Sequence, residues 1–79
     1  MNIHITWFSL LREQAGIGEE SFEFPGGTAQ DLYSLLSARH RFTLPQASLR
    51  VAVNDGFSDW DTTLSDQDRL VFIAPVGGG

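Results

Sequence analysis

The chain has 79 residues, of which ten are acidic and five are basic, and its formal net charge is −5 at pH 7. This length fits a single domain over residues 1–79, and no apolar run approaches the roughly 20 residues that span a bilayer. Cysteine and lysine are both absent, which excludes disulfides, thiolate metal sites and a thiol nucleophile. The five arginines are scattered along the chain, which disfavours nucleic-acid binding.

The excess of acidic over basic residues has two interpretations. It keeps a small protein in solution, or it attracts a basic surface on a partner protein. The first residues, Met1 to His4, lack the basic and apolar segments of a signal peptide, so we expect a cytoplasmic protein with no membrane partner.

Alternating apolar residues predict the first two strands. Residues 3–8 alternate, and residues 21–24 alternate again before a proline–glycine–glycine turn. The segment 12–18 breaks the pattern and contains two glycines, so we expect a long loop that joins two antiparallel strands. The residues of the first strand expected on its core-facing side are Ile3, Ile5 and Trp7.

A helix is expected after the turn. Thr28 is a candidate N-cap, and Asp31, three residues later, stands in the place of the usual glutamate of a capping box. The segment 39–41 is basic and marks the end of the helix, where positive charge is favourable. The apolar residues expected to face the core are Ala29, Leu32, Leu35 and Leu36.

Three more strands are predicted in the remaining chain. Residues 49–53 form one strand, which an Asn–Asp–Gly turn joins to a short strand over residues 57–60. The apolar run 70–74 predicts a central strand that is covered at least in part on both faces, and Pro75 ends it. The first and last strands are the most apolar, so we place them side by side at the centre. The order of elements predicts an α+β fold of the β-grasp type, a mixed sheet with one main crossing helix.

The common catalytic patterns are missing. His4 and His40 lie far apart in the sequence, and we expect both at the surface. The aspartates at positions 59, 61, 66 and 68 are expected to be solvated turn residues rather than metal ligands. Gly26 and Gly27 precede a helix but lack the spacing and the lysine of a phosphate-binding loop. We therefore expect no metal, no bound cofactor and no catalysis by the chain alone.

An apolar surface patch is the better candidate site. By strand parity, Phe8 and Ile73 point away from the core side of the sheet, and Phe57 beside the turn could join them. A contiguous patch of this kind next to the C-terminus would mark a partner interface. The alternative is that these residues complete the core of a small twisted sheet.

The last residues predict a thin, flexible tail over residues 76–79. Three glycines without side chains end in a carboxylate at Gly79. Four extended residues reach roughly 13 Å, at about 3.3 Å each, which is enough to enter the active site of another protein. A frayed terminus without a function is the alternative.

The chain resembles the MoaD family of ubiquitin-like sulfur carriers, the small subunits of molybdopterin synthase. The family ending is typically Phe-x-Pro-Pro-Val-x-Gly-Gly, so Ala74 replaces one proline here, and Gln67 stands where the acidic turn usually holds glycine. The segments that carry the resemblance are residues 3–8, 11–13, 51–54, 64–68 and 72–79.

The resemblance implies a sulfur carrier for molybdenum cofactor biosynthesis that is not an enzyme on its own. A ubiquitin-activating-type adenylating enzyme would consume ATP to couple AMP to the carboxylate of Gly79, and a sulfur donor protein would convert the adduct to a thiocarboxylate. Val76, Gly77 and Gly78 would thread a channel in the large synthase subunit, in a heterotetramer that delivers sulfur to cyclic pyranopterin monophosphate. The family's partner-contact positions match Phe8, Arg12, Phe57, Ile73 and Pro75.

Three alternatives remain open from the sequence. The chain could carry sulfur for thiamine or another sulfur-containing metabolite. It could be a protein modifier that forms isopeptide bonds through Gly79, although without lysine it cannot form lysine-linked polymers of itself. It could also be a plain interaction domain with an inert tail.

Overall fold

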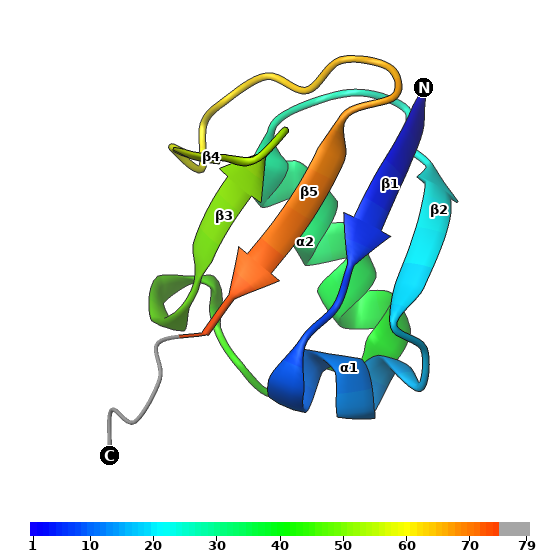
Figure 1. The fold of residues 1–79 in the computed structure, drawn as a ribbon, viewed down its shortest axis with the longest axis vertical. Helices are drawn as coiled ribbons and strands as arrows, with labels where there is room; N and C mark the ends of the chain where they lie inside the picture. Colours follow the sequence, from blue (N-terminus) through cyan, green and yellow to red (C-terminus); the bar gives the residue numbers. More distant parts are fainter. Residues whose placement is uncertain (75–79) are drawn as a thin grey trace.

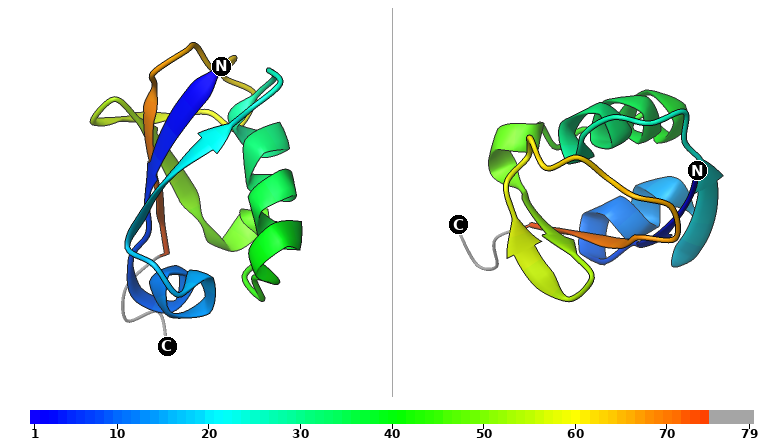
Figure 2. Two further views of the ribbon diagram at one scale, coloured as in Figure 1. Left: turned by 90° about the vertical axis from the view of Figure 1, so that its right-hand side faces the viewer. Right: turned by 90° about the horizontal axis from the view of Figure 1, so that it is seen from above.

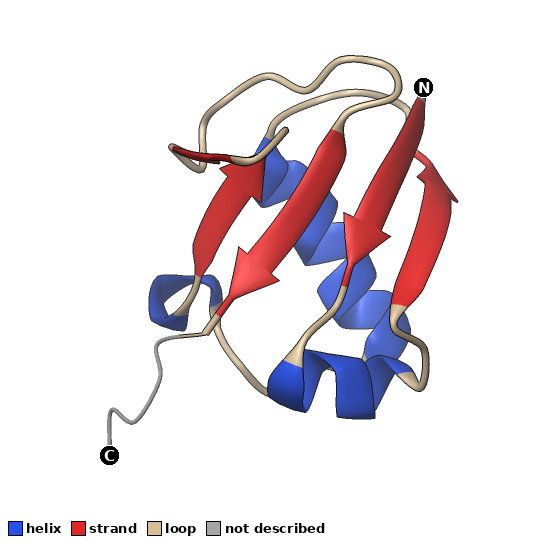
Figure 3. Ribbon diagram, in the orientation of Figure 1, coloured by secondary structure: helices blue, strands red, loops and turns tan. Residues whose placement is uncertain are grey.

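The first and last strands pair in parallel at the centre of a five-stranded sheet with the order β2-β1-β5-β3-β4. The computed structural model describes residues 1–74. All other strand pairs are antiparallel, so the predicted mixed sheet and its two central strands are confirmed (Figures 1 and 3). The strands are β1 (Asn2–Thr6), β2 (Glu19–Glu23), β3 (Arg50–Val53), β4 (Gly56–Ser58) and β5 (Arg69–Ile73).

One long helix, α2 (Ala29–His40), crosses one face of this sheet, whereas the other face carries no helix in the described chain (Figure 2). The predicted capping box starts the helix. The Thr28 hydroxyl accepts a hydrogen bond from the Asp31 amide at 3.2 Å, and the Asp31 carboxylate accepts one from the Thr28 amide at 3.0 Å. The helix ends at Arg41, whose φ of 58° lies in the left-handed region. The local capping box therefore determines where α2 begins, and at its end the Arg41 amide donates a hydrogen bond to the Ser37 carbonyl.

The core-facing stripe of α2 differs from the expected one at a single position. Leu36 is fully buried, but Leu35 is 46% exposed, so its predicted burial is wrong. Successive helical residues are rotated by about 100°, and the buried arc is centred between Leu32 and Tyr33, which leaves Leu35 outside it. Tyr33 fills the arc instead, because its ring packs 5.2 Å from that of Phe72.

A second helix, α1 (Ser9–Ala15), occupies part of the segment that was expected to be a loop. Leu11 is buried and anchors the helix to the core. Gly16 ends it with a φ of 80° and donates its amide hydrogen to the Arg12 carbonyl at 2.9 Å. The loop prediction was wrong because this glycine caps a helix rather than forming an open turn. A short 3-10 helix, η1 (Gln46–Ser48), precedes β3.

The edge of the core contains a mostly buried polar cluster that the sequence did not reveal. The carboxylate of Glu20 accepts hydrogen bonds from Trp7 Nε1 at 2.9 Å and from His40 Nε2 at 2.6 Å. The His40 side chain is only 11% exposed, so its predicted place at the surface is wrong. The cluster joins the end of α2 to β2 and to the fully buried Trp7, which makes it a structural contact.

Candidate functional site

The face of the sheet opposite α2 carries a row of apolar residues. Val71 of β5 lies beside Thr6 of β1 and beside Ala52 of β3, and Ala52 lies beside Phe57 of β4. Paired residues on neighbouring strands share a face. The row therefore crosses four strands on the side that α2 leaves uncovered.

Two exposed phenylalanines flank this row. Phe57 is 66% exposed and Phe8 is 51% exposed, which excludes the alternative that they complete the core. Phe8 precedes α1 with an extended backbone, so the alternation that places Thr6 on the open face places Phe8 there too. Ile73 is partly buried at the end of β5. We call the set the open-face patch, and it consists of Phe8, Ala52, Phe57, Val71 and Ile73.

Two members of the open-face patch were missed from the sequence. Val71 lies two residues before Ile73 in one strand, and Ala52 pairs with Val71. Alternation within β5 could have identified Val71, because residues at i and i+2 share a face. Ala52 joins the patch only through the register between strands, which the sequence alone did not specify.

One arginine borders the open-face patch, and a second, which the sequence singled out, lies on α1. Arg50 pairs with Ile73 across β3 and β5, and its guanidinium lies 5.3 Å from the centre of the Phe57 ring. Arg12 is exposed on α1, and its side chain packs on Gly18, where an added Cβ would lie 3.2 Å from Arg12 Cζ. The sequence pointed to Arg12 as a partner contact, and that role stays a prediction.

The patch extends along the open face to the end toward which β1 and β5 both run. Phe8 follows β1 and Ile73 ends β5, whereas Phe57 lies level with Val71 in the middle of β5. Figure 1 shows that β5 ends near η1 and on the same side as α1. Ala74 is the last described residue. The expected tail, which consists of Val76, Gly77, Gly78 and Gly79, lies outside the described residues, and so does Pro75, which was expected to contact a partner.

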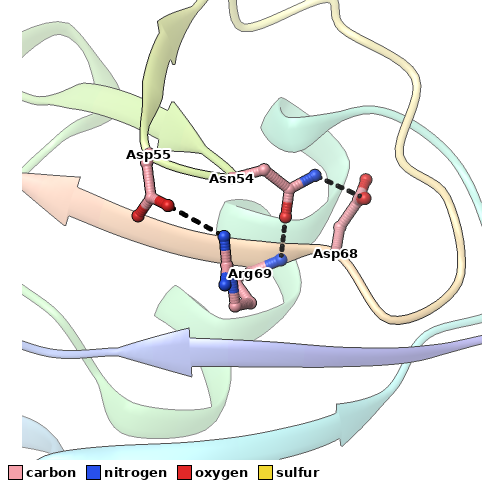
Figure 4. Close-up of polar contacts among 4 residues, drawn as sticks. All are labelled: Asn54, Asp55, Asp68 and Arg69. Carbon is pink, nitrogen blue, oxygen red and sulfur yellow. Dashed lines mark hydrogen bonds and ion pairs between the residues drawn. The ribbon is translucent and has the colours of Figure 1, made fainter.

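The opposite end of the sheet is held by polar side chains (Figure 4). The Asn54 amide group accepts a hydrogen bond from the Arg69 backbone and donates one to Asp68, both at 2.9 Å. The Arg69 guanidinium contacts the Asp55 carboxylate at 2.9 Å. These contacts tie the turn between β3 and β4 to the start of β5, so they have a structural role.

Two residues outside the patch have shifted pKa values. The Asn2 amide donates a hydrogen bond to Asp66 at 2.6 Å, which lowers the pKa of that carboxyl group below 3.8. Burial raises the pKa of the Tyr33 hydroxyl, which donates a hydrogen bond to the Leu44 carbonyl at 2.6 Å. Both groups support turns or loops, as the sequence predicted for the aspartates near residue 66.

The described part of the chain offers no metal centre, since residues 1–74 contain no group of three or more histidine, aspartate or glutamate side chains placed to hold an ion. Within the same residues, neither helix is long and apolar enough to cross a membrane. The arrangement that distinguishes this molecule is therefore an exposed apolar surface at the origin of the C-terminal segment.

Comparison with known proteins identifies relatives of this arrangement. A model of the ThiS family matches residues 5–79. A protein from Pyrococcus furiosus, named as molybdopterin converting factor subunit 1, is 28% identical with a TM-score of 0.83, and the alignment covers 96% of this chain and 99% of that one. No curated protein sequence gives a match.

Two further solved structures have the same fold at lower identity. SAMP1 from Haloferax volcanii is 21% identical with a TM-score of 0.81, over 100% of both chains. A chain in the complex of subunits 1 and 2 of molybdopterin-converting factor from Helicobacter pylori is 20% identical with a TM-score of 0.70, again over 100% of both chains. The predicted β-grasp fold is confirmed by these similarities.

Proposed function

We propose, since the chain belongs to the ThiS family of ubiquitin-like sulfur carriers, that it carries sulfur on the carboxylate of Gly79 for molybdenum cofactor biosynthesis. The observation that carries this proposal is the open-face patch, in which Phe8 is 51% and Phe57 66% exposed on the face that α2 leaves uncovered, the face that also carries Ile73 at the end of β5. A carrier needs such a surface because its partners must hold the domain while the tail reacts in their active sites.

The chemistry follows from the weak reactivity of a carboxylate. Its oxygen is a poor leaving group, so the carboxylate must first attack the α-phosphorus of ATP and release pyrophosphate. Sulfur from a donor protein, at the oxidation level of sulfide, then attacks the acyl carbon and displaces AMP, which leaves a thiocarboxylate on Gly79. If the donor supplies a persulfide, the acyl disulfide that forms must be reduced by two electrons from a thiol to release the thiocarboxylate. The ATP is bound and consumed by the adenylating partner. The chain itself holds no cofactor and contributes the reacting carboxylate and the docking surface.

The second partner in this proposal is the large subunit of molybdopterin synthase. Support comes from the similar chain in the Helicobacter pylori complex, which is found together with a subunit 2. We propose a heterotetramer in which Pro75 contacts the large subunit and Val76, Gly77 and Gly78 thread its channel. There the thiocarboxylate would pass its sulfur to cyclic pyranopterin monophosphate to form the dithiolene. All these steps would take place in the cytoplasm.

The same tail chemistry would serve related functions. A sulfur carrier for thiamine or another metabolite shares every step up to the thiocarboxylate, and a protein modifier shares the adenylation. The acceptor therefore distinguishes the three functions: the large subunit with its pterin substrate, a different sulfur-accepting enzyme, or the amino group of a target protein.

The test is loading of sulfur followed by its delivery. The chain is incubated with ATP, the adenylating enzyme and a sulfur source, and its intact mass is measured. We expect one exchange of oxygen for sulfur in the C-terminal peptide, and dithiolene formation when the large subunit and the pterin are added. Loading without delivery to the pterin would favour another metabolite, and absence of loading would contradict the sulfur-carrier proposal.

Two variants serve as controls for the chain end. Deletion of Gly79, or addition of one residue after it, should abolish loading because the reacting carboxylate is displaced. Neither change should alter the free energy of unfolding, since the core consists of residues 3–72. If the extended chain supports dithiolene formation as well as the wild type, the assignment of Gly79 is wrong.

A further inference from the structure

The strand β2 forms one edge of the sheet, and one side of its backbone has no neighbouring strand. It is the first strand in the order β2-β1-β5-β3-β4, and Figures 1 and 2 show no segment of the described chain beyond its outer edge. The other edge strand, β4, has three residues, whereas β2 has five, all paired in register with β1. Proteins shorten, twist or cover edge strands to prevent pairing with other chains, so a regular edge of this length is a candidate binding surface.

The hydrogen-bond pattern identifies the backbone groups of β2 that point outward. The Phe24 amide donates to the Met1 carbonyl, and the Trp7 amide donates to the Gly18 carbonyl, both at 2.8 Å. Bonded and non-bonded pairs alternate along an antiparallel ladder, so every second residue of β2 between these two pairs bonds to β1. No other described residue forms a hydrogen bond with the backbone of the remaining three. The residues with outward N–H and C=O groups are Glu19, Ser21 and Glu23.

The exposed side chains at this edge are acidic at both ends of the strand. Glu23 lies 3.5 Å from the amino group of Met1, and its side chain is 82% exposed. Arg12 packs on Gly18, next to Glu19, but within residues 1–74 no ion pair joins Arg12 to Glu19. Opposite charges on directly paired strand residues are favourable. A strand added at this edge would therefore be stabilised by basic side chains on the open face.

The side of β2 that faces α2 has a different character. Phe22 is partly buried there, and the Arg39 guanidinium lies 5.8 Å from the centre of its ring. The Glu20 carboxylate on this side is already engaged by Trp7 and His40. An added strand would meet an aromatic ring and a cation here, which favours an apolar side chain over a basic one.

We propose that the outer edge of β2 binds an extended segment of a partner protein as an additional antiparallel strand, in which basic side chains on the open face alternate with apolar side chains toward α2. In this binding mode main-chain hydrogen bonds supply affinity, and alternate side chains supply specificity. β2 and β4 are opposite edges of the sheet, so the bound segment leaves Phe57 of the open-face patch uncovered. Binding at this edge does not depend on sulfur transfer.

A second copy of the chain does not match this edge. Two β2 strands that pair antiparallel about Ser21 place Glu19 of each copy opposite Glu23 of the other. Like charges directly opposite each other destabilise a pair of strands. The acidic edge therefore disfavours self-association and selects a basic segment.

Amide exchange in the presence of a synthetic peptide tests the inference. The peptide is short and capped, alternates valine with lysine, and has lysine at its centre. It is added to the isotope-labelled full chain at up to about 5 mM, which exceeds a dissociation constant of about 1 mM. Nuclear magnetic resonance then follows hydrogen exchange. We expect exchange to slow at least about threefold at Glu19, Ser21 and Glu23, and less than about 1.5-fold at the amides that already bond to β1.

Methylation of the peptide backbone is the matched control, because it leaves the protein unchanged. N-methylation of the central lysine removes an N–H that faces β2, whereas N-methylation of a neighbouring valine alters one that points to solvent. We expect the first change to weaken binding at least about fivefold and the second less than about twofold. Absence of protection by the unmethylated peptide, or any other ranking of the two methylated peptides, would overturn the inference.

Charge reversal tests the selection of a basic segment. Glu19→Lys changes the edge, and Asp61→Lys makes the same change in net charge in the exposed loop between β4 and β5. We expect Glu19→Lys to weaken binding of the peptide at least about threefold more than Asp61→Lys. Equal effects, or equally tight binding of a peptide with glutamate in place of lysine, would overturn the inference. So would protection of the same amides by an increase in protein concentration alone, because the occupant would then be a second copy.

Discussion

Two adjacent residues on α2 show how the rotation between successive helical positions determines whether a side chain is buried. Leu35 and Leu36 have the same apolar character in the sequence, yet Leu35 is 46% exposed and Leu36 is fully buried. A buried leucine loses both its transfer free energy and its packing contacts when it is truncated, whereas an exposed one loses little. Truncation at the two positions therefore compares the stability contributed by a buried leucine with that of an exposed one.

We predict that Leu36→Ala lowers the free energy of unfolding by about 2–5 kcal/mol. Leu35→Ala should lower it by less than about 1 kcal/mol, because its side chain is already in contact with water. Urea denaturation followed by tryptophan fluorescence measures both. Equal losses at the two positions would mean that Leu35 packs against the core in solution.

Asp66 gives a prediction for the pH dependence of stability. Its pKa is lowered below 3.8 because the Asn2 amide donates a hydrogen bond to the carboxylate. A group with a lowered pKa stabilises the folded state above its unfolded pKa and loses this contribution as the pH falls through the folded pKa. Asp66→Asn should therefore reduce the loss of stability below about pH 4, as measured by acid denaturation. If the Asp66→Asn variant lost stability at low pH to the same extent as the wild type, the assigned hydrogen bond would be contradicted.

At the scale of elements, the start of α2 depends on a glycine next to its capping box. Gly27 has a φ of 137°, and a Cβ at this position would lie 2.6 Å from Asp31 Oδ2. That oxygen accepts the hydrogen bond from the Thr28 amide. A side chain on Gly27 would therefore strain the backbone and displace the capping carboxylate together.

Gly27→Ala should lower the free energy of unfolding by about 1–2 kcal/mol, the size of a lost cap with added backbone strain. The control is Gly56→Ala, where the nearest atom to an added Cβ is the Val53 carbonyl oxygen at 3.9 Å. We expect the control to change stability by less than about 0.5 kcal/mol. Thermal unfolding of both variants is measured by circular dichroism. Equal decreases in the unfolding midpoint would show that the capping box contributes little to stability.

At the scale of the whole molecule, the two faces of the sheet differ. One face packs against α2 and forms the core, and the other carries the open-face patch beside the origin of the tail. This division lets exposed residues contact partners without contributing much to folding.

Phe8→Ala and Phe57→Ala should each weaken binding to the large synthase subunit by more than about 1 kcal/mol, the usual threshold of an important interface residue. Their effects on unfolding should be small, since both side chains are half exposed or more. Leu35→Ala is the matched control, because it removes an exposed apolar side chain from the helix on the other face. Calorimetry that finds normal affinity for both phenylalanine variants would remove the patch from the interface.

Local signals in the sequence determined much of this protein. Alternation predicted the strands, the Thr28–Asp31 pair predicted the start of α2, and the apolar character of the first and last strands predicted their central pairing. Strand parity also placed Phe8 on the uncovered face. The strands, the helix start and the parity of Phe8 depend on residues close together in the chain. The central pairing of the first and last strands followed instead from their apolar composition, because the most apolar strands are the ones buried in the middle of a sheet.

Other features were decided only by the tertiary structure. Residues 9–15 form a helix because Leu11 reaches the core and Gly16 caps the last turn. The His40 side chain is mostly buried because Glu20 and Trp7, which are distant in the sequence, lie beside it. Ala52 joins the open-face patch through the register of β3 with β5. Such contacts join segments that are far apart in the chain, and local patterns do not specify which of them meet.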